Sequence, residues 1–66
     1  MRIWFNGEPR ETGDNISVAD LLRELNLAPQ RVAVEVNLEL VPRGEHSARR
    51  LAADDRLEVV TLVGGG

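Results

Sequence analysis

Cysteine and lysine are both absent from this chain of 66 residues. Without cysteine the chain can form no disulfide, no thiolate metal site and no cysteine nucleophile. Without lysine it has no side-chain amine, which makes it a poor acceptor for an isopeptide bond. His46 is the only histidine, and a zinc site needs three or four nitrogen or sulfur ligands. These absences exclude much of the metal chemistry and covalent chemistry open to a small domain.

Long hydrophobic runs and an excess of positive charge are missing too. The apolar runs are only a few residues long, so no segment is predicted to span a membrane, and the opening MRIWFNGEPR lacks a signal-peptide core. Eight arginines are scattered among eleven acidic residues, for a net charge of −3, whereas binding to a phosphate backbone needs a basic stripe. We therefore expect a cytoplasmic protein that binds neither nucleic acid nor membranes.

The residues that are present have the composition of one small globular domain. Hydrophobic residues make up 42% of the chain and charged residues 29%, which is typical of a folded soluble protein. A chain of this length buries only about 60% of its unfolded surface, so we expect a small margin of stability.

The first residues predict a β-hairpin. Ile3 and Phe5 share one face of a strand, and Trp4 lies on the other face, where we expect it to be half covered. Asn6–Gly7 is a strong signal for a two-residue hairpin turn. Pro9 cannot donate a hydrogen bond to a neighbouring strand, which predicts that the return strand is an edge strand.

A helix is predicted over Val18–Leu25, where apolar residues recur at the spacing of one helix face. Ser17 is the expected N-cap, and Asp20, three residues later, completes an acidic variant of the capping box. Asn26 suits the left-handed position that ends many helices.

The second half predicts three more strands. Residues 32–36 alternate in the manner of a strand, Leu40–Val41 form a short return strand, and residues 56–63 form the last one. Asn37–Leu38 joins the first two of these. The favoured two-residue turns need positive φ, which leucine resists, so we expect a longer turn or another turn type there.

The loop over residues 42–53 is expected to contain one helical turn near Ala48–Leu51 and to leave His46 solvated. His46 and Ser47 are not expected to form a catalytic set with Asp54–Asp55, because residues within one loop rarely converge in space. The adjacent carboxylates point in opposite directions and are expected to build the turn into the last strand. We expect no internal active site.

The predicted element order is β-β-α-β-β-β, in which one amphipathic helix must cover one face of a sheet. This indicates a two-layer α+β domain over residues 1–62, followed by a short tail over residues 63–66. The expected core consists of Ile3, Phe5, Val18, Leu21, Leu22, Leu25, Val32, Val34, Val36, Leu51, Leu57 and Val59.

The last seven residues, VTLVGGG, form the most unusual segment. A glycine backbone can pass where a Cβ would clash, so such a tail can enter a narrow active site of another protein. Its carboxylate is a poor electrophile, and it would act as a substrate that ATP adenylates before a nucleophile attacks. Leu62 and Val63 would anchor the chain at the mouth of the channel. The alternative is a chain end without a role, as most chain ends are.

Three stretches carry a resemblance to a known family: VADLLREL (18–25), VAVEVNLELVPR (32–43) and DDRLEVVTLVGGG (54–66). Together with the element order and the final glycines, they resemble the sulfur carrier proteins of thiamine biosynthesis, the ThiS family. The last stretch is the most specific of the three, because a Gly-Gly end alone is shared with ubiquitin-like modifiers and molybdopterin synthase small subunits.

The resemblance implies the β-grasp fold of ubiquitin-like proteins, with a mixed sheet of about five strands, and a carrier rather than an enzyme. The chain would have no catalytic residue, metal or bound cofactor of its own. A ubiquitin-activator-like adenylyltransferase would use ATP to attach AMP to the carboxylate of Gly66. Sulfur from a cysteine desulfurase persulfide would then convert Gly66 to a thiocarboxylate, which donates sulfur to thiazole synthase. The partner-binding residues would be the tail, Val63, Gly64 and Gly65, and a docking surface around Val60 and Leu62.

Two positions depart from the family pattern, which usually has glycine where Leu38 and Asp54 stand. Both lie in turns and bear on local geometry rather than on the chemistry of the tail. Other functions remain open from the sequence. They are a carrier of the same fold for molybdopterin synthesis or transfer-RNA thiolation, and a ubiquitin-like modifier or non-covalent interaction module.

Overall fold

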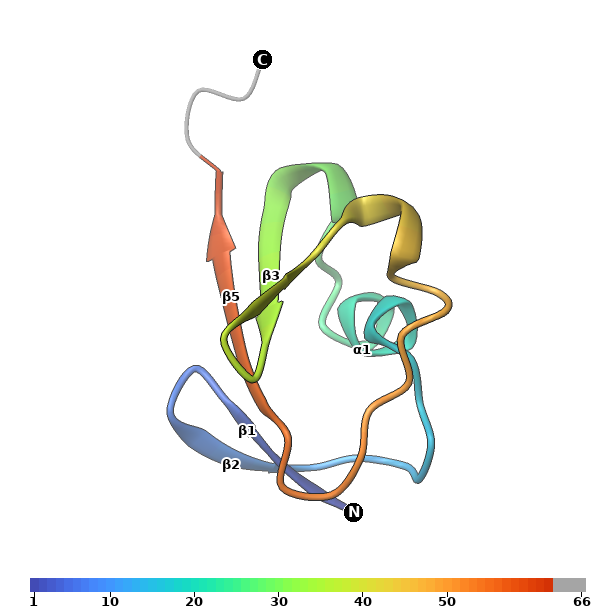
Figure 1. Cartoon of the computed structure of the whole chain (residues 1–66), viewed down its shortest axis with the longest axis vertical. Helices are drawn as coiled ribbons and strands as arrows, with labels where there is room; N and C mark the ends of the chain where they lie inside the picture. The colour runs from blue at the N-terminus through green and yellow to red at the C-terminus, as the bar shows by residue number, and fades with distance from the viewer. Residues whose placement is uncertain (63–66) are drawn as a thin grey trace.

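The structure, a computed structural model, describes residues 1–62. A five-stranded mixed sheet in the order β2-β1-β5-β3-β4 has one α-helix on one of its faces (Figure 1). This is the predicted β-grasp fold. The elements are β1 (Arg2–Phe5), β2 (Glu8–Glu11), α1 (Val18–Glu24), η1 (Pro29–Arg31), β3 (Val32–Val36), β4 (Glu39–Val41), η2 (Arg43–Glu45) and β5 (Arg56–Thr61), where η marks a one-turn 3₁₀ helix.

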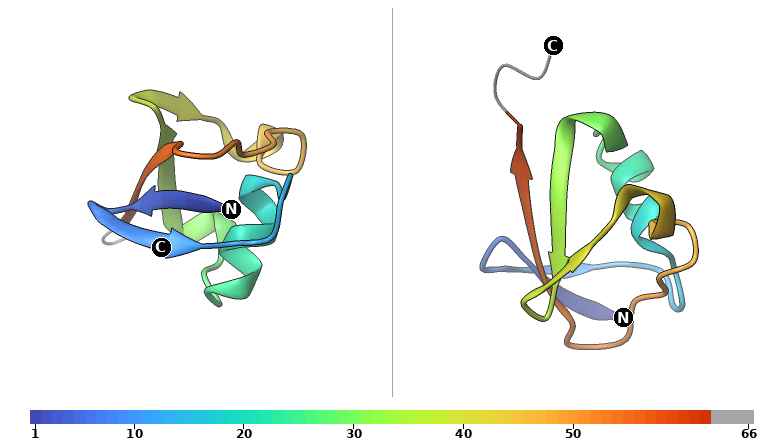
Figure 2. Two further views of the ribbon diagram at one scale, coloured as in Figure 1. Left: turned by 90° about the horizontal axis from the view of Figure 1, so that it is seen from below. Right: turned by 45° about the horizontal axis from the view of Figure 1, so that its top comes forward.

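The first and last strands lie side by side and parallel at the centre of the sheet. Trp4 pairs with Arg56 and Phe5 pairs with Leu57, whereas β1–β2, β3–β4 and β3–β5 pair antiparallel. The β1–β2 hairpin runs across the lower end of β5, with which β1 pairs (Figures 1 and 2). Pro9 lies in β2 at the edge of the sheet, as predicted, where its missing N–H costs no ladder bond.

Two tight hairpin turns have positive φ at both central residues. Asn6 and Gly7 have φ values of 49° and 84°, and Asn37 and Leu38 have values of 53° and 69°. Both turns are therefore of the type that matches the twist of the flanking strands. The expectation of a longer or different turn at Leu38 was wrong. Asp54, at φ 70°, is also left-handed, so both positions where the resembled family has glycine adopt a conformation that glycine favours.

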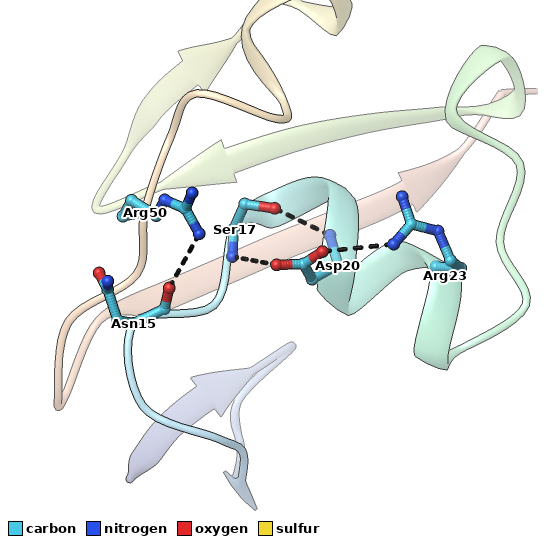
Figure 3. A network of polar contacts seen from close by, with 5 residues as sticks. All are labelled: Asn15, Ser17, Asp20, Arg23 and Arg50. Carbon is cyan, nitrogen blue, oxygen red and sulfur yellow. Dashed lines mark hydrogen bonds and ion pairs between the residues drawn. The ribbon is translucent and has the colours of Figure 1, made fainter.

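The capping box predicted for α1 is present (Figure 3). The backbone N–H of Asp20 donates to Ser17 Oγ, and the backbone N–H of Ser17 donates to Asp20 Oδ2, both at 3.0 Å. Arg23 reaches back to Asp20 Oδ1 at 3.3 Å. The helix ends at Glu24, one residue earlier than predicted, and Asn26 has the expected left-handed conformation, with φ 58°.

The core lies between α1 and the sheet, with contributions from the loop after β4. Ten of the twelve predicted core residues are buried. Phe5 and Leu25 are only partly buried, and Val41 is an additional core member. Phe5 borders a hollow of about 220 Å³ with Glu8, Pro9 and Arg10, which explains its partial exposure.

The loop over residues 42–55 differs most from expectation. Its helical turn lies at Arg43–Glu45 rather than near Ala48–Leu51, and His46 is 4% exposed rather than solvated. The reason is that the loop is held against the start of α1. The His46 carbonyl accepts from Ala19 N at 3.0 Å, and the Arg49 carbonyl accepts from Val18 N at 2.9 Å. No helix within residues 1–62 has the length and apolar character needed to cross a membrane.

Candidate functional site

The last described residues place the end of β5 at a rim of the sheet. In β5, Leu57 and Val59 point into the core, whereas Val60 is 56% exposed and Leu62, just beyond the strand, is 49% exposed. The backbone N–H of Leu62 donates to the Arg31 carbonyl at 2.8 Å, and this hydrogen bond holds Leu62 beside the start of β3. The predicted tail residues, Val63 and Gly64–Gly66, lie outside the described residues.

One face of the sheet is not covered by α1, and we call it the open face. Residues directly opposite each other on antiparallel strands share a face, so the pairs Ala33–Val60, Glu35–Glu58 and Glu35–Leu40 lie together on it. Four large apolar side chains are exposed within residues 1–62. Leu40 and Val60 belong to the open face, Leu62 continues it beyond β5, and Leu38 lies in the turn at its end.

A hollow of about 170 Å³ lies at the end of the open face away from Leu62, with Trp4, Leu38 and Arg56 among its lining residues. The guanidinium of Arg56 lies 5.5 Å from the centroid of the Trp4 ring, within the range of a cation–π contact. Trp4 is partly buried, as the sequence predicted, and Arg56 lies against its ring.

The side chains that the sequence offered as candidates for catalysis, His46 and Asp55, take part in hydrogen bonds that hold the fold together. Nε2 of His46 lies 3.2 Å from the Val41 carbonyl in the protein interior, so the ring is not available to a substrate. Asp55 accepts hydrogen bonds from Ala52 N at 2.8 Å and from Asn37 Nδ2 at 3.0 Å, which gives it the predicted role of a turn builder. Among residues 1–62, no three histidine or acidic side chains gather in a group that could hold a metal ion.

A family model described as the ThiS family matches residues 3–66, almost the whole chain. The chain belongs to the ThiS family. A solved thiamine biosynthesis protein (ThiS) from Geobacter metallireducens has the same fold, with a TM-score of 0.87, 30% sequence identity and full coverage of both chains. The resemblance drawn from the three sequence stretches is thereby confirmed.

Two relatives at 44% identity match the chain over its entire length. One is a protein named ycf40 from Pyropia yezoensis, of which the match covers 93%. The other is named thiazole synthase and comes from Magnetococcus marinus, and the match covers 20% of it. The chain thus spans a fifth of the length of the thiazole synthases it matches.

Sequence reasoning identified Val60 and Leu62 but not the wider surface to which they belong. Glu35 and Leu40 lie on the same surface because β3 pairs with β4 and β5 in a register that places Glu35 opposite both Leu40 and Glu58. Alternation along each strand indicates which residues share a face, but the offset between strands 20 residues apart is set by tertiary packing.

Proposed function

We propose that this chain is a sulfur carrier protein of thiamine biosynthesis and that Gly66 carries the sulfur as a thiocarboxylate. Membership of the ThiS family carries the proposal. The name thiazole synthase on two relatives that contain a matching segment supports thiamine synthesis over molybdopterin synthesis or transfer-RNA thiolation.

The chemistry requires a free α-carboxylate on Gly66. A carboxylate oxygen attacks the α-phosphate of ATP on a ubiquitin-activator-like adenylyltransferase, and pyrophosphate leaves. A persulfide sulfur, supplied ultimately by a cysteine desulfurase, then attacks the acyl carbon, and AMP leaves. Cleavage of the resulting S–S bond by a thiol leaves the thiocarboxylate, whose sulfur passes to thiazole synthase. The carrier is a co-substrate in each step and not the catalyst.

The described residues support this use of the tail. The hydrogen bond from Leu62 N to the Arg31 carbonyl holds the chain in place at Leu62, four residues before Gly66. Three glycines bring no side chain into a partner's active site. Val63 would stand at the mouth of the channel, and exposed Val60 and Leu62 would bury apolar surface against the partner.

Reconstituted thiazole formation tests the proposal. The cognate adenylating enzyme, sulfur donor and thiazole synthase are supplied with the full chain or with a variant that lacks Gly65 and Gly66. We expect the truncated variant to yield no thiazole and to unfold at the same temperature as the full chain. Gly44→Ala is a matched control, because no atom lies within 4 Å of the added Cβ and its φ is not positive. Thiazole formation that persists without the two glycines would refute the proposal.

A further inference from the structure

Two glutamates face each other at the centre of the open face. Glu35 on β3 and Glu58 on β5 are direct partners in the antiparallel register, and both are exposed. Leu40 is the partner of Glu35 on β4, and Val60 follows two residues after Glu58, so apolar side chains border the acidic pair. Like charges directly opposite each other on neighbouring strands destabilise a sheet.

No cation within the described part of the chain neutralises this pair. The ion pairs formed by residues 1–62 join Arg23 to Asp20 and the amino group of Met1 to Asp14. Arg56 shares the open face and lies two residues before Glu58, but its guanidinium lies over the ring of Trp4. The free protein therefore presents two uncompensated carboxylates within an apolar border.

We propose that the open face docks on thiazole synthase and that an arginine or lysine of that enzyme enters between Glu35 and Glu58. The apolar border, Leu40 and Val60, would exclude water from the ion pairs and strengthen them. This inference rests on the proposed function and extends it from the tail to the recognition of the partner.

Charge and position both favour this occupant. The net charge of −3 complements a basic surface, and such complementarity acts mainly on the rate of encounter and on the choice of partner. Val60 and Leu62 connect the acidic pair to the beginning of the tail, so a partner that receives the tail lies next to the pair. Two relatives named thiazole synthase contain a segment that matches this chain, which favours that enzyme as the partner.

Binding to the cognate thiazole synthase tests the docking face. Calorimetry or interferometry compares the full chain with Glu35→Gln, Glu58→Gln and the double variant. Glu39→Gln is the matched control, because Glu39 is exposed on β4 but pairs with buried Val36 and so does not share the open face. We expect the double variant to raise Kd at least about tenfold, because the loss of a charged partner from a desolvated ion pair weakens binding more than the loss of an exposed charge does. Glu39→Gln should leave Kd within about twofold, since isolated surface charges contribute little.

Two further readouts distinguish an ionic contact from a structural role. The double variant should show a shallower dependence of Kd on salt concentration, because it has lost ion pairs that salt screens. Its unfolding temperature should match or exceed that of the full chain, since the variant removes a repulsion. A lower unfolding temperature would assign the glutamates to folding and overturn the proposal.

Thiocarboxylate formation, measured on the same samples, separates failure of the docking face from failure of the proposed function. If the thiocarboxylate and thiazole both form while the double variant binds thiazole synthase as tightly as the full chain does, the docking proposal is wrong and the carrier function stands. A double variant impaired only in adenylation would assign the face to the adenylating enzyme and overturn our choice of partner. If no thiocarboxylate forms and the full chain does not bind thiazole synthase, both proposals fail.

Discussion

Replacing Leu38 with glycine should stabilise this protein, although it removes a leucine. Leu38 has φ 69° and is 88% exposed. A left-handed conformation costs a residue with a Cβ roughly 1–2 kcal/mol, and glycine avoids this cost. Glycine in turn has more backbone entropy to lose, which costs about 0.5–1 kcal/mol. The lost burial is small, about 0.3 kcal/mol for a side chain that is nine-tenths exposed. We expect a net gain of about 0.5 kcal/mol.

The matched control is Leu38→Ala, which removes the same exposed side chain but keeps the Cβ and therefore the backbone strain. Urea denaturation should place the glycine variant about 0.7 kcal/mol above the alanine variant in free energy of unfolding, as the difference between strain and glycine entropy requires. Thermal unfolding should show the same order, separated by about 3–5 °C for a domain of this size. A glycine variant no more stable than the alanine variant would refute the assignment of strain to this turn.

Three further predictions concern the helix cap and the buried histidine. Ser17→Ala removes the acceptor for the backbone N–H of Asp20 and should lower the free energy of unfolding by about 1 kcal/mol in urea denaturation; an unchanged urea midpoint would contradict the capping role. Hydrogen bonding by Ser17, through its backbone N–H first, holds the pKa of Asp20 below its ordinary value of 3.8. The stability that this carboxylate contributes is therefore present above about pH 3.8 and is lost as the pH falls through the lower folded pKa. Asp20→Asn should flatten the pH dependence of stability in this acid range and leave it unchanged above pH 5, whereas an identical acid profile would argue against the shift. His46→Ala should cost roughly 2 kcal/mol, because it empties a buried site and leaves the Val41 carbonyl without the ring nitrogen; a cost within 0.5 kcal/mol would fit the solvated loop residue that the sequence suggested.

Local patterns in the sequence were sufficient where a single segment determines its own structure. The spacing of apolar residues and the Ser17–Asp20 box predicted α1 to within one residue at its end. Asn6–Gly7 predicted the first turn, and Pro9 predicted an edge strand, because each depends on the conformational limits of one or two residues.

Local sequence patterns could not predict the features that depend on contacts between distant segments. The burial of His46 follows from backbone hydrogen bonds between its loop and the start of α1, about 27 residues earlier in the chain. The turn at Leu38 also shows tertiary structure overriding a local preference. Pairing of β3 with β4 and β5 stabilises the hairpin enough to hold a leucine in a left-handed conformation.

The candidate site likewise has one part that a local segment indicates and another that depends on distant segments. The role proposed for Gly66 comes from the sequence alone and stays a prediction, because residues 63–66 lie outside the described part of the chain. The acidic pair on the open face depends on the register that places Glu35 opposite Glu58, which are 23 residues apart in the sequence. Strand alternation alone does not specify that register.

The intact mass of the protein tests the central claim most directly. The chain is incubated with ATP, its cognate adenylating enzyme and a sulfur source, and its mass is then compared with that of a variant that lacks Gly66. We expect the full chain to gain the mass difference between one sulfur and one oxygen atom, and the variant to gain nothing. An unchanged mass of the full chain, with partner enzymes shown to be active, would contradict the claim that Gly66 carries sulfur.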